Sequence, residues 1–309
     1  MSLPEEFLQR LHNIIPANKL QAVIDSFSNT KHCTFRLNTL KETKENILTQ
    51  LNALTFESLP HFHDCYYIDN KQRDVLTRSA AAENGLIYIQ NPSSMLAPII
   101  LDPIENSEIL DLCAAPGSKT SQIACMMKNS GRLAAVEKNR ARFYKLKANC
   151  ERLGITNTHF YLKDGATVWR SCENRFDKTL IDAPCSSETR FNSHDPKSYA
   201  HWNLKKIKEM TKKQWPLLSS AFRATKPGGT LVYSTCSFAP EENEVIVNKL
   251  IKRFKGSASI KPIHITLDNI QPGLTEWGNK KMDPSLENCI RILPNNIFSG
   301  FFICLIEKN

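Results

Sequence analysis

The sequence predicts an α/β protein with a doubly wound, mostly parallel sheet and a small α+β module ahead of it. From about residue 107 onward, short apolar runs alternate with segments of helical spacing, which is typical of parallel sheets covered by helices on both faces. Residues 31 to about 90 instead mix short strand patterns with one helical pattern. The chain has 309 residues, 41% of them hydrophobic, which suffices for one large domain and a smaller one.

The expected elements follow in chain order. Two short helices are predicted in the first 30 residues, the second beginning near Pro16. Strand composition then marks HCTFRLN, CYYID and GLIYIQ, and helical spacing marks KETKENILTQLNAL. Further along, the predicted strands are EILDL, RLAAVE, HFYLK, FDKTLID and GTLVYST, and residues 289–306 form a closing hairpin. Helices are predicted over SKTSQIACMM, RARFYKLKANCERLG, 203–224 and EENEVIVNKLIKRF. We therefore expect a helical segment over 1–30, the α+β module over 31–92 and the α/β domain over 93–309.

The composition limits the cellular compartment in which we expect the protein and the kinds of partner that it binds. Ten scattered cysteines without a C-x-x-C pair favour reduced thiols in a cytoplasmic protein. No stretch approaches the roughly 20 apolar residues of a membrane span, so we expect no membrane partner. His61 and His63 have no further ligands nearby in the sequence, so a surface turn is favoured over a metal site. The net charge of +9 suits a polyanionic partner, although many enzymes of small metabolites are equally basic.

The segment EILDLCAAPGSKTSQIA predicts a strand ending near Leu112, a tight loop, and a helix beginning near Ser118. The N-terminus of a helix offers unpaired N–H groups and attracts a carboxylate or phosphate. Gly117 is the loop's one glycine, so the loop lacks both the G-x-G-x-x-G fingerprint and the phosphate loop. This disfavours a dinucleotide or triphosphate and leaves a ligand with one carboxylate and a small sulfonium head possible.

Acidic residues stand at the ends of the next three predicted strands. Glu137 ends the second strand, where a carboxylate suits two ribose hydroxyls, Asp164 follows the third, and Asp182 ends the fourth. A single acid after a strand is most often a helix cap or a solvated turn residue. Because three occur in this order, and ligands bind beyond the carboxyl ends of parallel strands, we expect them to converge on one crevice.

Three motifs carry a resemblance to a known family. DLCAAPGSKT, DAPCSSE and YSTCSFAPEENE resemble, in order and separation, the Nop2/Sun (RsmB/RsmF-like) family of RNA cytosine-5 methyltransferases. FRLNTLK, QNPSSMLAPIIL, RILP and SGFF extend the match from about residue 30 to the end of the chain. The resemblance implies a Rossmann-like methyltransferase sheet, an RRM-like N-terminal module, S-adenosyl-L-methionine as cofactor and RNA as partner.

The resemblance also implies roles for two cysteines. Carbon 5 of cytosine is a poor nucleophile until a thiolate adds at carbon 6, so the reaction needs an attacking cysteine. In the family this is the cysteine of the TC motif, here Cys236, while the PC-motif cysteine, here Cys185, promotes breakdown of the adduct. Asp182 would bond to the cytosine edge and Lys119 would lie in the same pocket. By itself, a cysteine near an apolar strand is usually a buried core thiol.

By the same correspondence, the cofactor contacts are Cys113, Ala114, Ala115, Pro116, Gly117, Ser118, Lys119, Glu137, Arg142, Asp164 and Asp182. The chain departs from the family pattern in three places. Ser118 stands where the family commonly has glycine, Glu137 where aspartate is usual, and SSETRF where many members continue with glycines. The last lies beside the expected base pocket, so it bears on the substrate and not on the type of reaction.

Two candidate RNA surfaces follow. The segment KSYAHWNLKKIKEMTKKQW interleaves lysines with aromatic side chains, which could hold phosphates and stack on bases; the alternative is a solvated helix that packs its tryptophans inward. Its members are Lys197, Lys205, Lys206, Lys208, Lys212, Lys213, Tyr199, His201, Trp202 and Trp215. The upstream module with Arg36 and Asn38 is the second candidate. We expect a monomer without an appended RNA-binding domain, with ribosomal RNA slightly favoured over transfer RNA.

Two other functions stay open. The first is the same chemistry on DNA, which is disfavoured because DNA enzymes attack with the PC cysteine and do not need the TC one. The second is a non-catalytic RNA-binding or ribosome-assembly factor that keeps the fold. The presence of Lys119, Asp182, Cys185 and Cys236 argues against it.

Overall fold

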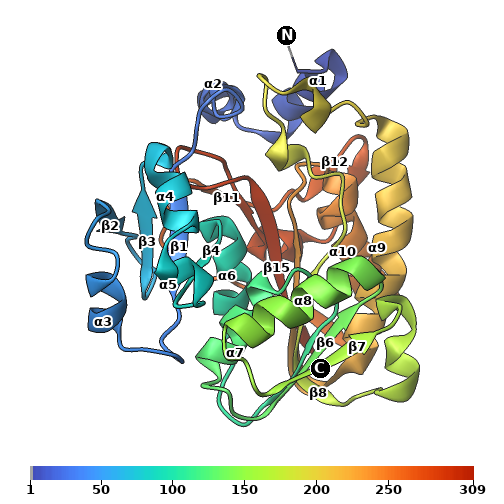
Figure 1. Ribbon diagram of the computed structural model, residues 1–309. Coiled ribbons are helices and arrows are strands. Elements are labelled where there is room, and N and C mark those ends of the chain that lie inside the picture. The colour runs from blue at the N-terminus through green and yellow to red at the C-terminus, as the bar shows by residue number, and fades with distance from the viewer. Residues whose placement is uncertain (1–2) are drawn as a thin grey trace.

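The computed structural model describes residues 3–309 and contains a large mixed sheet, a small sheet beside it and a short helical segment at the N-terminus (Figure 1). The strands of the large sheet run in the order β11-β14-β15-β9-β8-β5-β6-β7, with β10 paired to β15. Its parallel strands are β5 (Glu108–Asp111), β6 (Arg132–Glu137), β7 (Thr158–Leu162), β8 (Phe176–Asp182) and β9 (Thr225–Thr235). The predicted doubly wound, mostly parallel fold is confirmed.

The remaining strands of the large sheet are antiparallel and lie at one edge. They are β10 (Ala258–Lys261), β11 (Ile270–Pro272), β14 (Ile290–Ile292) and β15 (Phe301–Lys308). The pairing of β14 with β15 confirms the predicted closing hairpin. A separate two-stranded ribbon consists of β12 (Glu276–Trp277) and β13 (Lys280–Lys281).

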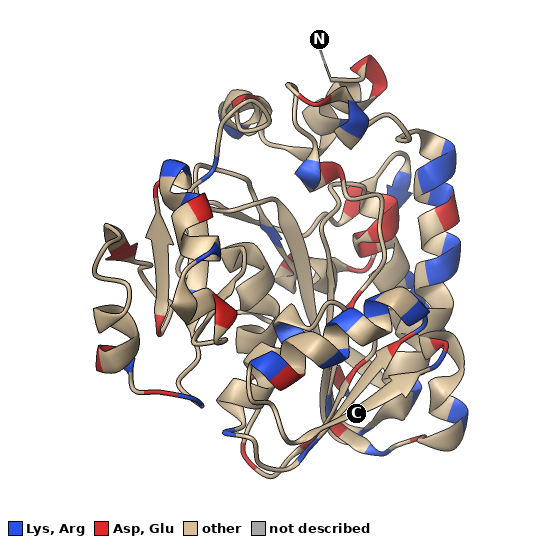
Figure 2. Ribbon diagram, viewed as in Figure 1, with Lys and Arg blue, Asp and Glu red and all other residues tan. Residues whose placement is uncertain are grey.

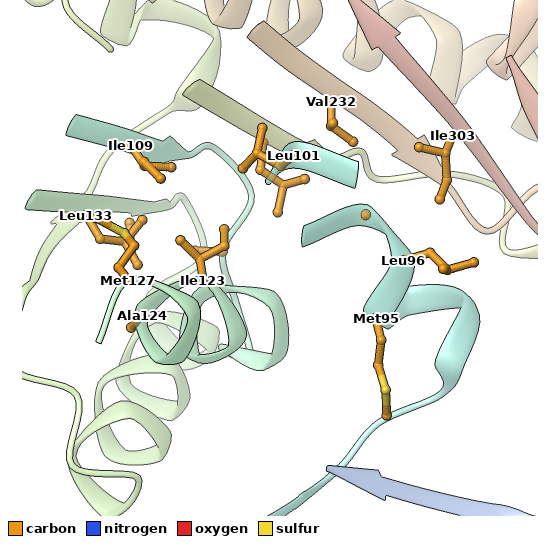
Figure 3. Close-up of a cluster of buried hydrophobic side chains, with 14 of the residues drawn as sticks. Met95, Leu96, Leu101, Ile109, Ile123, Ala124, Met127, Leu133, Val232 and Ile303 are labelled. Atoms are coloured by element: carbon orange, nitrogen blue, oxygen red, sulfur yellow. The ribbon is translucent and has the colours of Figure 1, made fainter. Parts of the chain in front are cut away.

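Helices cover both faces of the large sheet because its strands are apolar on both sides. Along β5, Ile109 faces one core cluster and the next residue, Leu110, faces the other. The first cluster is covered by α6 (Pro92–Leu101), α7 (Ser118–Met126) and α8 (Arg140–Arg152), and part of it is drawn in Figure 3. The second is covered by α9 (Leu204–Ala224) and α10 (Glu244–Arg253). Successive side chains of a strand point to opposite faces, which produces this division.

Helix α6 was not expected from the sequence, where its apolar run is interrupted by prolines. Pro92 stands at its first position, where no N–H donor is needed, and the Asn91 side chain accepts a hydrogen bond from Ser93 N. The helix is apolar on most sides and is correspondingly buried between the sheets, with Met95 and Leu96 in the core (Figure 3).

The small sheet has the order β2-β3-β1-β4 and is entirely antiparallel. Its elements are β1 (Cys33–Leu37), α3 (Lys44–Thr49), β2 (Phe56–Ser58), β3 (Cys65–Ile68), α4 (Arg73–Thr77), α5 (Ala80–Glu83) and β4 (Ile87–Ile89). Strands β1, β3 and β4 and helix α3 were predicted, whereas β2, α4 and α5 were not. Helix α3 is shorter than its pattern because it begins after Thr43, whose side chain caps Asn46 N.

The N-terminal helices α1 (Glu5–Ile14) and α2 (Ala17–Asp25) confirm the two predicted helices and pack onto the large domain. The Phe7 ring lies 4.9 Å from the ring of Phe191 and 6.3 Å from that of Phe238. Phe191 follows Cys185 and Phe238 follows Cys236 within a few residues, so this apolar cluster supports the loops that carry the two motif cysteines. The proposed division of the chain at residues 30 and 92 stays a prediction. Within residues 3–309, no helix has the length and apolarity needed to cross a bilayer.

Candidate active site

A cavity of about 1080 Å³ opens at the carboxyl ends of the parallel strands, where the fold places ligands. Both motif cysteines, Cys185 and Cys236, line it. So do the predicted cofactor residues, except Gly117 and Asp164: Cys113, Ala114, Ala115, Pro116, Ser118, Lys119, Glu137, Arg142 and Asp182. The structure therefore brings nearly all of the predicted site residues together at one edge of the sheet.

The loop between β5 and α7 forms one wall of the cavity. Gly117 has φ 106°, which residues with a side chain rarely adopt, and a Cβ there would lie 3.1 Å from Leu146 Cδ1. This glycine shapes the turn without lining the cavity, and α7 begins directly after it. Ser118 and Lys119 are thereby placed in the first turn of α7, whose N-terminal N–H groups suit a carboxylate.

Asp111, at the end of β5, is a further site residue that the sequence analysis missed. Its side chain is buried, lines the cavity and accepts a hydrogen bond from Thr120 Oγ1 at 2.7 Å. Burial raises the pKa of this carboxyl to about 6. The second oxygen, Oδ1, has no hydrogen-bond partner in the described part of the chain. A buried acceptor without a partner beside a cavity suits a ligand with an N–H donor.

Glu137, expected at the ribose hydroxyls, and Asp164, expected as a further cofactor contact, lie in different environments. Glu137 is buried at the end of β6 and accepts a hydrogen bond from Asn139 N at 2.7 Å, and Arg142 Nη1 lies 3.7 Å from its other oxygen. Asp164 instead caps a short helical turn through Ala166 N and pairs with Lys138 at 2.6 Å. The hydrogen bond from Lys138 lowers the pKa of Asp164. Asp164 thus has the cap role that is commonest for an acid after a strand.

Lys119 and Asp182 form an ion pair inside the cavity. Lys119 Nζ lies 2.6 Å from Asp182 Oδ2 and donates to Ser94 Oγ at 2.7 Å, and it is 5.2 Å from the centre of the Phe301 ring. Both side chains line the cavity, but the lysine is 6% exposed and Asp182 is 35% exposed, so the carboxylate is the more accessible member of the pair. The ammonium orients this carboxylate, with Ser234 Oγ 3.3 Å from its other oxygen.

The two motif cysteines meet because they follow adjacent parallel strands. Asp182 at the end of β8 is in register with Ser234 near the end of β9, and the sulfur atoms of Cys185 and Cys236 lie 3.3 Å apart. All ten cysteines of the chain are free thiols. The two are not equivalent. The hydrogen bond from the Cys185 thiol, followed by the charge of Arg190, lowers the pKa of Cys236 to about 6.

The same hydrogen bond, together with burial, raises the pKa of Cys185 well above its ordinary value. The opposite directions of the two pKa shifts favour Cys236 as the thiolate and Cys185 as the thiol that donates to it. Cys113 also lines the cavity, but burial raises its pKa strongly, so it stays a thiol. Arg190 was missed in the sequence, although it lies in SSETRF, the segment already marked as a departure from the family pattern.

The expectations about RNA surfaces need correction. Arg36 is buried and donates to Gln90 Oε1 at 3.0 Å and to Ser121 Oγ at 2.5 Å, so it joins the small sheet to α7. Asn38 is buried as well and donates to carbonyl oxygens of Gly85 and Leu153, both at 2.8 Å. The proposal that these two side chains form an RNA surface is wrong, since both serve as links within the protein.

The alternative of inward-packed tryptophans is supported by Trp202, just before α9, and by Trp215 on α9, both partly buried against the core. Trp202 packs against Phe7, with ring centres 5.6 Å apart, and donates to Glu188 at 2.8 Å. The Trp215 ring lies 4.1 Å from Lys249 Nζ. The helix does keep an exposed row of lysines along its outer side, at Lys205, Lys208, Lys212 and Lys213 (Figure 2). His61 and His63 are exposed, and no group of potential metal ligands occurs within residues 3–309.

A second, smaller groove of about 480 Å³ adjoins the cavity and shares Asn91, Thr189, Arg190 and Ser299 with it. Segments from the N-terminal helices, the small sheet and the loop after Cys185 line it. Its ionisable side chains include Lys31, His32, Arg73, Arg190 and His194. Of the described residues that line the groove, none is acidic. The groove therefore suits a polyanion that continues from the cysteines outward.

A doubly wound sheet with a ligand cavity and two thiols at its carboxyl edge has the architecture of the Rossmann-like methyltransferases. The family model described as 16S rRNA methyltransferase RsmB/F matches residues 98–307, and the model for the N-terminal domain of 16S rRNA methyltransferase RsmF matches residues 3–92. The chain belongs to this RsmB/F family, which confirms the resemblance seen in the motifs.

Individual relatives agree with the family match. The proteins named Ribosomal RNA small subunit methyltransferase F from Vibrio parahaemolyticus and Escherichia coli are each 33% identical to this chain, over 99% of it and 63% of their own length. The chain thus spans a little under two thirds of these relatives. The crystal structure of a methyltransferase homolog from Pyrococcus horikoshii is 28% identical, with a TM-score of 0.81 over 99% of this chain and all of that one.

Proposed function

We propose that this chain is an S-adenosyl-L-methionine-dependent methyltransferase that forms 5-methylcytosine in RNA through a covalent adduct with Cys236. The observation that carries the proposal is the thiol pair: two sulfurs 3.3 Å apart, with the pKa of Cys236 lowered to about 6, beside a carboxylate in a cavity large enough for a base and a cofactor. The names of the relatives, which are small-subunit ribosomal RNA methyltransferases, favour ribosomal RNA over transfer RNA.

The cavity fits the cofactor in the features that can be compared. The unpartnered Oδ1 of Asp111 suits the ammonium of its methionine part, and the first turn of α7 suits the carboxylate. Glu137, buried at the neighbouring strand end, suits the ribose hydroxyls. When bound, the cofactor supplies the methyl group that the base receives.

In the proposed reaction the Cys236 thiolate adds to carbon 6 of cytosine, so that carbon 5 becomes nucleophilic. Asp182, oriented by Lys119, bonds to the polar edge of the base and holds it in place. After methyl transfer the carbon 5 proton passes to solvent, its electron pair re-forms the double bond between carbons 5 and 6, and the bond from Cys236 to carbon 6 breaks to release the thiolate. The Cys185 thiol lies 3.3 Å from the departing sulfur and can donate a hydrogen bond to the thiolate as it re-forms, which promotes release.

A base can reach this cavity only as an extruded or unpaired nucleotide, so the flanking RNA must be held outside it. The second groove supports such an arrangement, because it adjoins the cysteines and presents Lys31, Arg73 and Arg190 without an acidic neighbour along its lining in the described residues. We propose that it holds the backbone of the nucleotides beside the target cytosine.

The test compares cysteine variants incubated with RNA and methyl donor. Cys236→Ala is expected to abolish methyl transfer and form no adduct, whereas Cys185→Ala accumulates a protein–RNA complex visible on a denaturing gel. Cys172→Ala, a half-buried thiol away from the cavity, is the matched control and should behave like the unchanged protein. The opposite pattern, with adducts only in Cys236→Ala, would reverse the roles of the two cysteines. Bisulfite sequencing of the product identifies the methylated position.

A further inference from the structure

Two buried glutamates lie directly behind the cysteine loops and have no part in the mechanism above. Glu188 and Glu242 are 1% and 0% exposed, and neither lines the cavity. Glu242 is hydrogen-bonded to Ser186, which directly follows Cys185, and Glu188 is hydrogen-bonded to Ser237, which directly follows Cys236. Burying a carboxylate destabilises the folded protein unless the group is fully hydrogen-bonded, so the hydrogen bonds of these two glutamates should show what they do.

We call the segment after β8, residues 183–191, the PC loop and the segment after β9, residues 236–243, the TC loop. Glu242 belongs to the TC loop, but its side chain binds the PC loop. Its Oε2 accepts hydrogen bonds from Ser186 N at 2.9 Å and from Gln214 Nε2 at 2.8 Å. Its Oε1 accepts from Ser186 Oγ and lies 3.0 Å from Ser237 Oγ. Gln214 Nε2 also donates to the carbonyl oxygen of Pro184 at 2.9 Å, so the residues on both sides of Cys185 are held.

Glu188 makes the reciprocal connection. It belongs to the PC loop, and its Oε2 accepts hydrogen bonds from two successive N–H groups of the TC loop, Phe238 N at 2.8 Å and Ala239 N at 2.9 Å. The same oxygen lies 3.0 Å from Ser237 Oγ, and Oε1 accepts from Trp202 Nε1. Each loop therefore contributes to a carboxylate contact that holds the other loop.

The hydrogen bonds between these groups require a shared proton. Four contacts join Ser186 Oγ, Ser237 Oγ and the two carboxyl groups, but the hydroxyls supply only two hydrogens. A proton held on Glu242 supplies a third hydrogen, and either oxygen of the Ser186–Glu242 contact can then be the donor. Burial, with the charge of Glu188 adding to it, raises the pKa of Glu242 to about 7, in keeping with such sharing.

We propose that Glu188 and Glu242 are positioning residues: together with Ser186 and Ser237 they clamp the PC loop to the TC loop and so set the distance between the Cys185 and Cys236 sulfurs. The spacing matters because the hydrogen bond from Cys185 weakens steeply as the sulfurs separate, and this bond is the main reason that Cys236 is a thiolate. The inference rests on the proposed function only where it assigns a catalytic benefit to this spacing.

The test measures how readily Cys236 is alkylated by iodoacetamide as a function of pH, in the full chain without RNA or cofactor. The modified peptide is quantified by mass spectrometry. In Glu242→Gln and in Ser186→Ala we expect the midpoint of the alkylation profile to rise by about one pH unit, because the hydrogen bond from Cys185 lengthens. The matched control is Glu241→Gln, whose carboxylate lies on the same turn but pairs with Arg10 near the surface, and its profile should stay unchanged.

If a variant has the same unfolding temperature as the wild-type protein but its alkylation midpoint does not shift, the clamp proposal is refuted. If Glu242→Gln does not fold, Ser186→Ala decides, since it removes a single hydroxyl. Assays of methyl transfer separate the two proposals. A shifted midpoint in a protein that methylates no RNA supports the clamp and refutes the function, whereas active variants with unshifted midpoints refute the clamp alone. Where RNA is methylated, the clamp variants should lose kcat while their KM for the methyl donor is retained.

Discussion

The sharpest prediction concerns the hydrogen bond between the two thiols, tested by Cys185→Ala. This bond is the largest cause acting on the pKa of Cys236 and lowers it to about 6; burial, which raises it, comes second, and the charge of Arg190, which lowers it, third. An ordinary thiol has a pKa of about 8.5, and burial outweighs Arg190, so losing the bond should move the Cys236 pKa to about 8.5 or above. At pH 7 a thiol of pKa 6 is about 90% thiolate, and one of pKa 8.5 about 3%.

The assay must follow the midpoint and not the rate at one pH. A thiolate of higher pKa is intrinsically more nucleophilic, with a Brønsted slope of about 0.4–0.5, so the alkylation rate at pH 7 changes only about two- to threefold. Because a lowered pKa keeps the group ionised to lower pH, the unchanged protein should reach half its maximal alkylation rate near pH 6. The variant should reach it well above pH 7. A midpoint that stays near 6 in Cys185→Ala, or lies near 8.5 in the unchanged protein, would refute the reasoning.

Two further predictions concern buried arginines and are tested by urea denaturation. Arg36→Leu should lower the free energy of unfolding by about 2–3 kcal/mol, because buried groups on α7 and the small sheet lose a charged donor. Arg73→Gln changes an exposed groove position of the same module and should leave the free energy of unfolding unchanged. It should instead weaken RNA binding and reduce the slope of log affinity against log salt concentration by about 1. If Arg36→Leu weakened RNA binding and Arg73→Gln lowered stability, Arg36 would be restored as the RNA contact. Arg291→Met should cost about 3–5 kcal/mol, because it leaves the carboxylate of Glu244 buried without its bidentate partner. Lys261→Met, which removes an exposed ion pair, should cost less than about 1 kcal/mol, and equal costs for the two would contradict the role assigned to burial.

Much of the large domain could be predicted because its signals are local. Ile109 and Leu110 are both buried, on opposite faces of the sheet, so β5 has a continuous apolar run that ends where the chain turns. Helix α7 starts at Ser118, immediately after a glycine with a positive φ, as the loop pattern indicates. Helix α6 could not be found in this way. Its prolines weaken the helical pattern, and its burial between the two sheets compensates for them.

Some residues of the candidate site could be predicted and others could not, because local patterns do not show which side chains reach the cavity. Glu137 and Asp164 have similar local patterns, but the cavity is lined by Glu137, whereas Asp164 turns back to cap Ala166 and pair with Lys138. Arg36 had the composition of an RNA contact, and yet the packing of the small sheet against α7 buries it. Burial depends on which elements pack together, and no local pattern contains that information.

By itself, the sequence determined which chemical groups stand at the ends of the strands: a thiol after each of two neighbouring strands, a lysine at the start of a helix, and acidic residues at successive strand ends. It also determined the family. Only the tertiary structure decided that the sulfurs of Cys185 and Cys236 lie 3.3 Å apart, that their pKa values shift in opposite directions, and that Glu188 and Glu242 connect their loops. These properties belong to pairs about 50 residues apart in the chain, and hydrogen bonds and charges act on distance in space, which folding alone sets.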